Sequence, residues 1–315
     1  MKNAQQKYWI IGGIGLLVVL FVMHLFAWKW DFSFFNNNVI FNTIRLPRSL
    51  AALFCGMLLA LSGLLLQILF ANPLAGPSIL GISSGASLGV AIAVIFGIGT
   101  FGIPAASLLG ALTYTMILIF SMRFVKSMLS LLLVGIMLSS FTVAIIDFLE
   151  IYAHEAKLKY FILWGMGSLQ QVSGSDLVVF LVVTLLVILL AVFISKDLTV
   201  FSQGEEFAAH LGVNGKKLRW FIIGITSLSV AVTTAFCGPI SFVGIAVPNI
   251  VRLVFKTSDS RKLMFGCLIF GPALLLLCDG LILLFDNYFV LPINSMTALF
   301  GAPFIIWIIF KKLKT

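Results

Sequence analysis

Charged residues are scarce in this chain of 315 residues. Only 10% of the residues are Asp, Glu, Lys or Arg, whereas 61% are hydrophobic. A soluble domain carries roughly 25% charged residues, because its surface must be covered by groups that water hydrates. This composition excludes an ordinary soluble protein, and it indicates that much of the surface contacts the lipid bilayer.

Patterns typical of metal sites and enzymes are also absent. The four cysteines stand singly within apolar runs without a C-x-x-C pair, and the three histidines are far apart in the sequence. Isolated cysteines of this kind are typical of buried packing residues. The sequence contains no G-x-x-x-x-G-K-[ST] phosphate loop and no H-E-x-x-H motif. We therefore expect no catalytic residue, no metal site and no cofactor in this chain.

Long apolar runs predict about ten transmembrane helices, because a helix needs about 20 apolar residues to cross the hydrocarbon core. The expected spans are 9–27, 49–69, 79–97, 102–122, 128–149, 176–195, 219–238, 239–255, 263–285 and 291–310. The first run is longer than the core of a signal peptide, so we interpret it as a retained span. Residues 220–255 give only about 54 Å of helix, so one of the two crossings there should be short or tilted.

The basic residues predict the orientation of these spans. If the N-terminus lies inside, 15 of the 20 Lys and Arg residues fall in inner segments and 5 in outer segments. Cytoplasmic loops accumulate Lys and Arg, so both termini are expected in the cytoplasm. The basic residues form short clusters and no stripe that alternates with aromatic residues, which argues against a nucleic-acid partner.

Two segments between spans are long enough to hold helices of their own. On the outer side, 151–175 is apolar enough for a short helix that lies against the membrane. On the inner side, Glu205–Gly212 begins with two acidic residues and ends with glycine, which favours a short helix with a favourable dipole and a glycine cap. The chain is thus expected to be one transmembrane domain, 1–315, that includes an inner loop at 196–218.

A series of short motifs resembles the permease subunits of ABC importers for ferric siderophores, haem and cobalamin, the FecCD type. The motifs, in chain order, are Arg45-Leu46-Pro47-Arg48, Asn72-Pro73-Leu74-Ala75-Gly76-Pro77, Leu80-Gly81-Ile82-Ser83-Ser84-Gly85-Ala86, Trp164-Gly165-Met166-Gly167-Ser168, Gly238-Pro239-Ile240-Ser241-Phe242-Val243-Gly244, Val247-Pro248-Asn249-Ile250-Val251-Arg252, Leu291-Pro292-Ile293 and Gly301-Ala302-Pro303-Phe304. No single motif is specific; their order, on consistent sides of the membrane, carries the resemblance.

The resemblance implies a fold, a function and a set of partners. The fold would be an all-α, cobalamin-permease-like (type II ABC importer) membrane fold in the bacterial cytoplasmic membrane. The permease would pair with a second copy or a homologue, with two cytoplasmic ATPases that bind ATP and magnesium, and with an external substrate-binding protein. The cargo would be an iron chelate, with a ferric siderophore ahead of haem or cobalamin.

The resemblance also implies roles for particular residues of this chain. Arg45 and Arg48 would dock the binding protein, since arginine forms bidentate bonds with carboxylates. The ATPase would contact the inner helix through Glu205, Glu206, Ala209, Leu211 and Gly212. The pathway and gate would include Gln67, Asn72, Pro73, Ser83, Ser84, Gly85, Gly238, Gly244, Pro248 and Asn249, although Ser83–Ala86 also suits close helix packing.

The sequence departs from the family pattern at three positions. Asn249 stands where the family commonly has His, and Asn294 stands where it often has Gly. Many members carry Arg a few residues after the acid that matches Asp279, whereas this chain continues with Gly280. The resemblance therefore does not extend to that outer contact with the binding protein. A different reading is an ion-coupled secondary transporter that uses Asp147, Glu150 or Asp279, because acids within spans are typical of ion paths.

Overall fold

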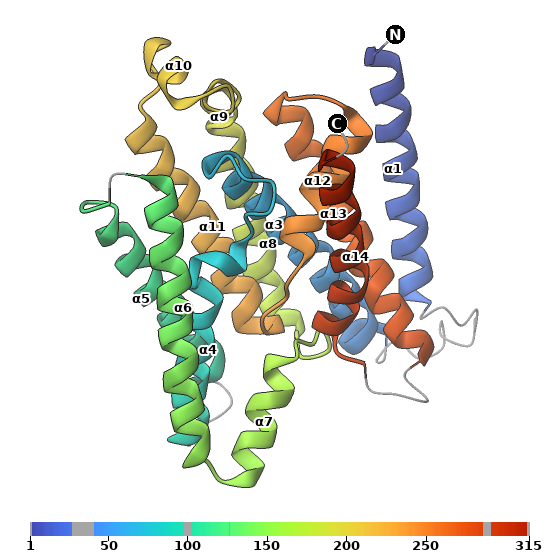
Figure 1. Cartoon of the computed structure of the whole chain (residues 1–315). Coiled ribbons are helices and arrows are strands. Elements are labelled where there is room, and N and C mark those ends of the chain that lie inside the picture. Colours follow the sequence, from blue (N-terminus) through green and yellow to red (C-terminus); the bar gives the residue numbers. More distant parts are fainter. Residues whose placement is uncertain (1, 27–40, 98–101, 126, 286–290, 314–315) are drawn as a thin grey trace.

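The computed structural model describes residues 2–26, 41–97, 102–125, 127–285 and 291–313. All regular elements in these ranges are helices (Figure 1). They are α1 (Lys2–Leu25), η2 (Phe41–Arg45), α3 (Leu46–Leu69), η3 (Pro77–Leu80), α4 (Ile82–Ile95), α5 (Gly102–Ser121), α6 (Met128–Ile151), α7 (Glu155–Gly165), α8 (Gly174–Phe193), α9 (Ser195–Phe201), α10 (Glu205–His210), α11 (Gly215–Cys237), α12 (Val243–Phe255), α13 (Ser260–Phe285) and α14 (Ile293–Leu313).

The predicted spans are confirmed. Within the described ranges, seven helices are long and apolar enough to cross a membrane, and α4, α12 and α14 are shorter apolar helices at predicted positions. The start of α1 and the end of α14 lie on the same side as α9 and α10, whereas α7 lies on the opposite side (Figure 1). This arrangement fits an even number of crossings with both termini on the inner side.

Helix α3 lies at the centre of the molecule. Its most apolar window is 78% buried, compared with 22% for α8, and it packs against α8, α11, α12 and α13. A Cβ atom at Gly63 would lie 1.8 Å from the carbonyl oxygen of Gly244 in α12. Small residues allow such close approach of two backbones, which is a common basis of helix association in membranes.

The stretch 220–255 forms two helices, the end of α11 and the short α12. Helix α12 has 13 residues, or about 20 Å of helix, which is short of the roughly 30 Å hydrocarbon core. Residues 238–242, which are not helical, connect α11 to it. The side-chain oxygen of Asn294 accepts a 3.1 Å hydrogen bond from the backbone of Ser241. Irregular backbone at membrane depth needs such internal partners, so Asn294 has a role that glycine could not fill.

The outer helix α7, which the sequence predicts within 151–175, is present as Glu155–Gly165. It rises from the outer end of α6 toward the centre of the molecule (Figure 1). Trp164, near its end, is buried in a cluster with Val90, Val94 and Ile103. The end of α7 therefore packs against protein, whereas Tyr160, Ile162 and Leu163 are exposed along the helix; contact of this face with the membrane stays a prediction.

Candidate functional site

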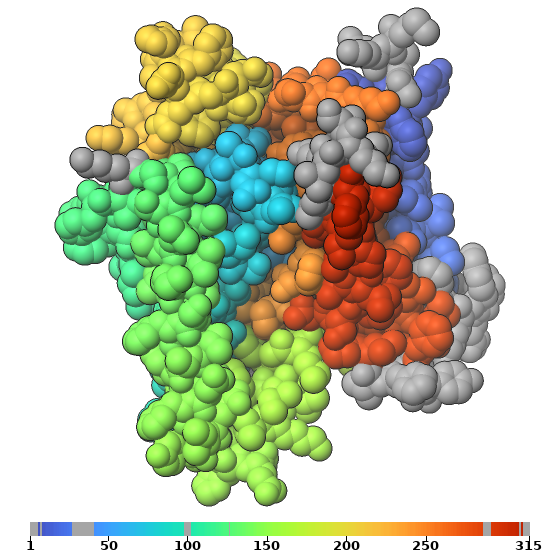
Figure 2. Space-filling model, viewed as in Figure 1, coloured from blue at the N-terminus to red at the C-terminus, as the bar shows by residue number. Residues whose placement is uncertain are grey.

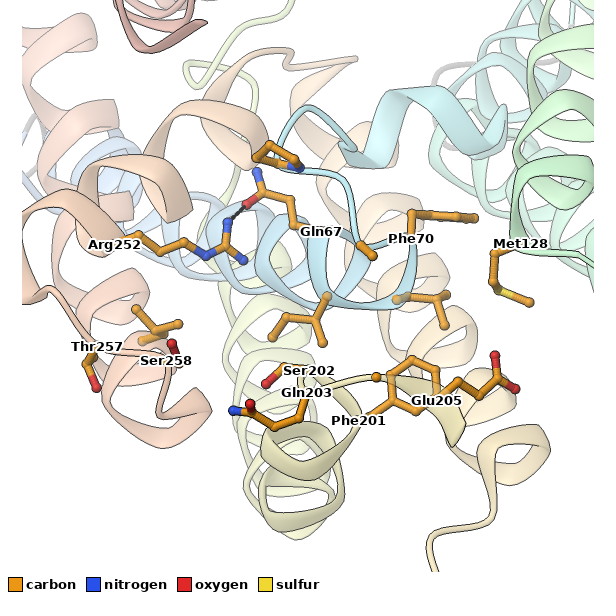
Figure 3. Close-up of a pocket in the computed structure, with 16 residues that line it drawn as sticks. Gln67, Phe70, Met128, Phe201, Ser202, Gln203, Glu205, Arg252, Thr257 and Ser258 are labelled. Carbon is orange, nitrogen blue, oxygen red and sulfur yellow. Dashed lines mark hydrogen bonds between the residues drawn. The ribbon is translucent and has the colours of Figure 1, made fainter. Parts of the chain in front are cut away.

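A polar cavity of about 530 Å³ lies at the inner end of the molecule, where α3 ends (Figure 3). Its polar lining includes Gln67, Ser202, Gln203, Glu205, Arg252, Thr257 and Ser258. Arg252 of α12 donates a hydrogen bond to the side-chain oxygen of Gln67, and the amide nitrogen of Gln67 donates to the Ile245 carbonyl at 3.2 Å. The side chain of Gln67, near the end of α3, therefore contacts α12 at two places, Ile245 and Arg252.

Asn249 makes a second connection at this end. Its side-chain nitrogen donates 2.8 Å hydrogen bonds to the carbonyl oxygens of Pro73 and Ile245. An amide nitrogen carries two N–H groups, whereas each ring nitrogen of histidine carries at most one. Asn249 thus holds the turn after α3 against α12, and this geometry explains how an amide serves where the family commonly has His.

The proposed pathway residues fall into three separate places. Gln67, Pro73, Gly244 and Asn249 gather where α3 meets α12, and the side-chain oxygen of Asn72 stabilises its own turn by accepting from Leu74 N at 2.9 Å.

The other two places lie outside this group. Gly85 is buried on α4, where an added Cβ would lie 2.3 Å from the Tyr114 ring of α5; this supports close helix packing at Gly85. Ser83 and Ser84 are half-buried beside it. Gly238, at φ +73°, lies under the end of α7. These distances separate the predicted set into an inner connection, a packing contact and an outer turn.

The face in Figure 2 is set back between α6 and α14, and the surface there is formed by the segment around α4 and by α12. Pro248 is buried within α12. The two flanking helices stand forward of this recess in Figure 2.

The inner loop forms the predicted helix α10, Glu205–His210. Its turn back is made by Gly212 at φ +83°, a conformation that glycine adopts without steric cost. Glu205 pairs with Arg219 at the start of α11. Ala208 is buried, whereas Phe207 and Leu211 are 52% and 60% exposed, so two apolar side chains extend from a helix that is fixed to the body.

At the outer end, Arg48 is buried and already paired. It is 6% exposed, and Asp279 of α13 is 2% exposed. The guanidinium of Arg48 donates bonds of 2.7 and 2.8 Å to the two carboxylate oxygens of Asp279. The expectation that Arg48 docks a partner is therefore corrected, because an intramolecular carboxylate already occupies its bidentate face.

Asp279 has a second partner in α1. His24 approaches its carboxylate at 2.8 Å and the hydroxyl of Ser49 at 2.7 Å. Arg45, by contrast, is half-buried and donates a 3.3 Å bond to the Leu25 carbonyl. The outer network thus joins α1, α3 and α13.

This network also bears on the ion-coupled reading. Asp279 is held by Arg48 and His24, Asp147 is exposed on α6, and Glu150 is half-buried near the end of that helix. The described residues contain no group of three His, Cys, Asp or Glu side chains that could hold a metal ion. Asp279 on α13 is thus fixed in a buried network, and the other two acids lie on a different helix, α6.

Sequence reasoning missed the roles of His24, Arg252 and Phe207. His24 and Asp279 are 255 positions apart, and Gln67 and Arg252 are 185 apart, so no local pattern joins them. Phe207 could have been found, because an apolar residue beside two acids on a short helix is a local signal.

The model of the FecCD transport family matches residues 8–311. The chain belongs to the FecCD transport family. The vitamin B12 import system permease protein BtuC of Yersinia enterocolitica is 36% identical over 310 residues, which is 94% of this chain and 91% of that protein. The BtuC protein of Klebsiella pneumoniae is 33% identical, over 99% of this chain and 96% of its own length.

Solved structures agree in fold. A structure described as an inward-facing metal-chelate type ABC transporter has a TM-score of 0.87 and 32% identity, covering 97% of this chain and 99% of its own. PsaBC from Streptococcus pneumoniae, solved with a Fab, has a TM-score of 0.60 at 19% identity and supports the fold alone. The protein is a multi-pass permease subunit of an ABC importer in the bacterial inner membrane.

Proposed function

We propose that this permease carries a bulky metal chelate, a ferric siderophore or a corrinoid such as cobalamin, into the cytoplasm. An external binding protein delivers the chelate, and partner ATPases hydrolyse ATP. The family membership and the match to a metal-chelate type transporter support the cargo class. The names of the relatives favour cobalamin among its members.

The observation that best supports an ATPase partner is the exposure of apolar side chains at helix α10. Phe207 and Leu211 are exposed on the inner side, on a helix that the ion pair between Glu205 and Arg219 fixes to α11. Exposed apolar side chains on a rigid helix are the usual anchors of a helix that sits in a partner's groove. We assign α10, with Glu206, Ala209 and Gly212, as the surface that contacts the ATPase.

Co-purification tests the ATPase contact. The permease is co-expressed with its neighbouring ATPase, and capture is compared between the native chain and the double variant Phe207→Ser, Leu211→Ser. We expect at least a tenfold loss of captured ATPase. Ile151→Ser removes an exposed apolar side chain from the outer end of α6 and is the control, which should capture as much as the native chain. Undiminished capture by the double variant would contradict the assignment.

Arg45 is the proposed docking residue for the binding protein at the outer end. A charge reversal, Arg45→Glu, should weaken binding of the solute-binding protein, and added salt should weaken binding of the native chain. Lys216→Glu is the control, since Lys216 lies at the inner start of α11. Equal affinities for the native chain and Arg45→Glu at low salt would exclude Arg45 from docking.

Transport by reconstituted complexes identifies the cargo. Proteoliposomes that contain the permease, ATPase and binding protein are given radiolabelled cobalamin, ferric siderophore or haem, with and without internal ATP. ATP-dependent uptake of one chelate supports the proposal. Uptake that persists without ATP and collapses with the proton gradient would support the ion-coupled reading instead.

A further inference from the structure

A second cavity, of about 390 Å³, lies at the outer end, between the starts of α5 and α8, the end of α11, and α7. It is lined by Ile103, Pro104, Tyr160, Trp164, Gln171, Asp176, Ala235 and Phe236. None of them is among the residues predicted for the pathway, the ATPase contact or the docking of the binding protein. Three of them are aromatic, and Asp176 is the one charged residue in this lining.

The aromatic groups are held in place by neighbours. The Trp164 ring stacks on Phe161 with centroids 6.3 Å apart, and Phe236 contacts Phe180 with centroids 5.6 Å apart. The Tyr160 side chain is partly exposed on α7. Faces of aromatic rings attract cations, and the attraction grows when the site excludes water.

Asp176 supplies a fixed negative charge to the same cavity. One of its carboxylate oxygens, Oδ2, accepts bonds of 2.8 and 2.7 Å from the backbone nitrogen and hydroxyl of Ser173, in the capping box of α8. Both bonds fall on Oδ2, so the orientation of the carboxylate is set while Oδ1 remains an acceptor. Gln171 adds an amide oxygen to the lining.

The surroundings of the cavity favour a lipid headgroup as its ligand. The helices beside the cavity expose apolar side chains that suit lipid: Leu109 of α5 is 65% exposed, and Val178 of α8, two residues after Asp176, is 61% exposed. Part of the lining belongs to the starts of α5 and α8, and these ends lie on the same side of the molecule as α7 (Figure 1). Tyrosine and tryptophan at this depth are typical of the headgroup region. A lipid headgroup at this end of the helices can therefore bring a cationic group to the cavity.

We propose that this cavity binds the primary ammonium group of an outer-leaflet phosphatidylethanolamine. The ammonium donates hydrogen bonds to Asp176 and Gln171 and lies against the rings of Tyr160 and Trp164. A choline headgroup has no N–H to donate, and an anionic headgroup is repelled by the carboxylate. The bound lipid would join α7 to α8 and so steady the outer turn that contains Gly238.

Native mass spectrometry of the detergent-purified chain tests the proposal. The chain is titrated with palmitoyl-oleoyl phosphatidylethanolamine, and with the phosphatidylcholine and phosphatidylglycerol of the same acyl chains. The ethanolamine lipid should bind most tightly. Asp176→Asn keeps an acceptor for Ser173 and removes the charge, so affinity for this lipid should fall about tenfold. Tyr160→Leu should lower it about threefold.

Two substitutions outside the cavity are matched controls. Glu155→Gln removes a charge from the first turn of α7, and Tyr152→Leu removes an exposed ring at the end of α6. Both should bind the ethanolamine lipid as the native chain does. Equal binding of the three lipids by the native chain, or unchanged affinity in both cavity variants, overturns the proposal. If Asp176→Asn does not fold, Tyr160→Leu and Gln171→Leu decide it.

Discussion

The two ends of this permease use the same kinds of side chain in opposite ways. At the outer end, Arg48 and Asp279 are buried and pair with each other. At the inner end, Glu205 is 53% exposed where it pairs with Arg219, and Arg252 lines an open cavity. The outer pair is buried between α3 and α13, whereas the inner pair of Glu205 and Arg219 lies partly on the surface, where a partner can reach it.

The energetic consequences of the two pairs differ because of burial. Removing one partner of a buried pair leaves the other charge without compensation in a medium of low polarity. Removing one partner of an exposed pair lets water take its place. The same chemical change should therefore have very different effects at the two ends.

The largest effect is expected for Asp279→Ala. It leaves the guanidinium of Arg48 buried without its carboxylate, and should lower the unfolding free energy by about 3–5 kcal/mol. Unfolding in mixed detergent micelles measures this. The double variant Arg48→Met, Asp279→Leu should recover much of the loss, because it buries no charge; failure to recover would mean that the pair does more than neutralise itself.

Gly63→Ala should have the next largest effect. The new methyl group would collide with the carbonyl of Gly244, so α3 and α12 must separate at a cost of about 1–3 kcal/mol. Gly224→Ala is the control, since a Cβ there meets nothing within 4 Å and alanine favours helix. The difference in unfolding free energy between the two variants measures the tightness of this contact.

Asn249→Leu should have an intermediate effect. It removes two hydrogen bonds and leaves the Pro73 carbonyl without this donor, at a cost of about 1–2 kcal/mol. Asn249→His can retain one of the bonds and should lose about half as much. If the histidine variant is less stable than the leucine variant, the bonds to the turn are not what Asn249 contributes.

Glu205→Gln should change stability least, by less than about 1 kcal/mol, because its carboxylate is half exposed and water screens the pair. A change in ATPase capture by this variant without a change in stability would show that the exposed pair serves the partner contact and not the fold. The expected difference between the two pairs would be contradicted if Glu205→Gln destabilised the chain as strongly as Asp279→Ala does.

Local signals were enough to predict α10 and most spans. The acids that begin α10 and the glycine that follows it are within eight residues of one another, and Gly212 has the expected left-handed backbone. The burial of Arg48 could not be predicted in this way. Its motif contains a second arginine three residues earlier, and nothing in the motif says which guanidinium meets Asp279, 231 positions away.

The sequence by itself determined the ten apolar spans, their orientation and the family, because hydropathy, charge bias and short motifs are properties of neighbouring residues. Only the tertiary structure decided which charges are buried and which are exposed. His24, Arg48 and Asp279 come from three helices, and the packing of α1, α3 and α13 brings them together. That packing, through the burial it imposes, makes the outer charges structural and leaves the inner helix free to bind.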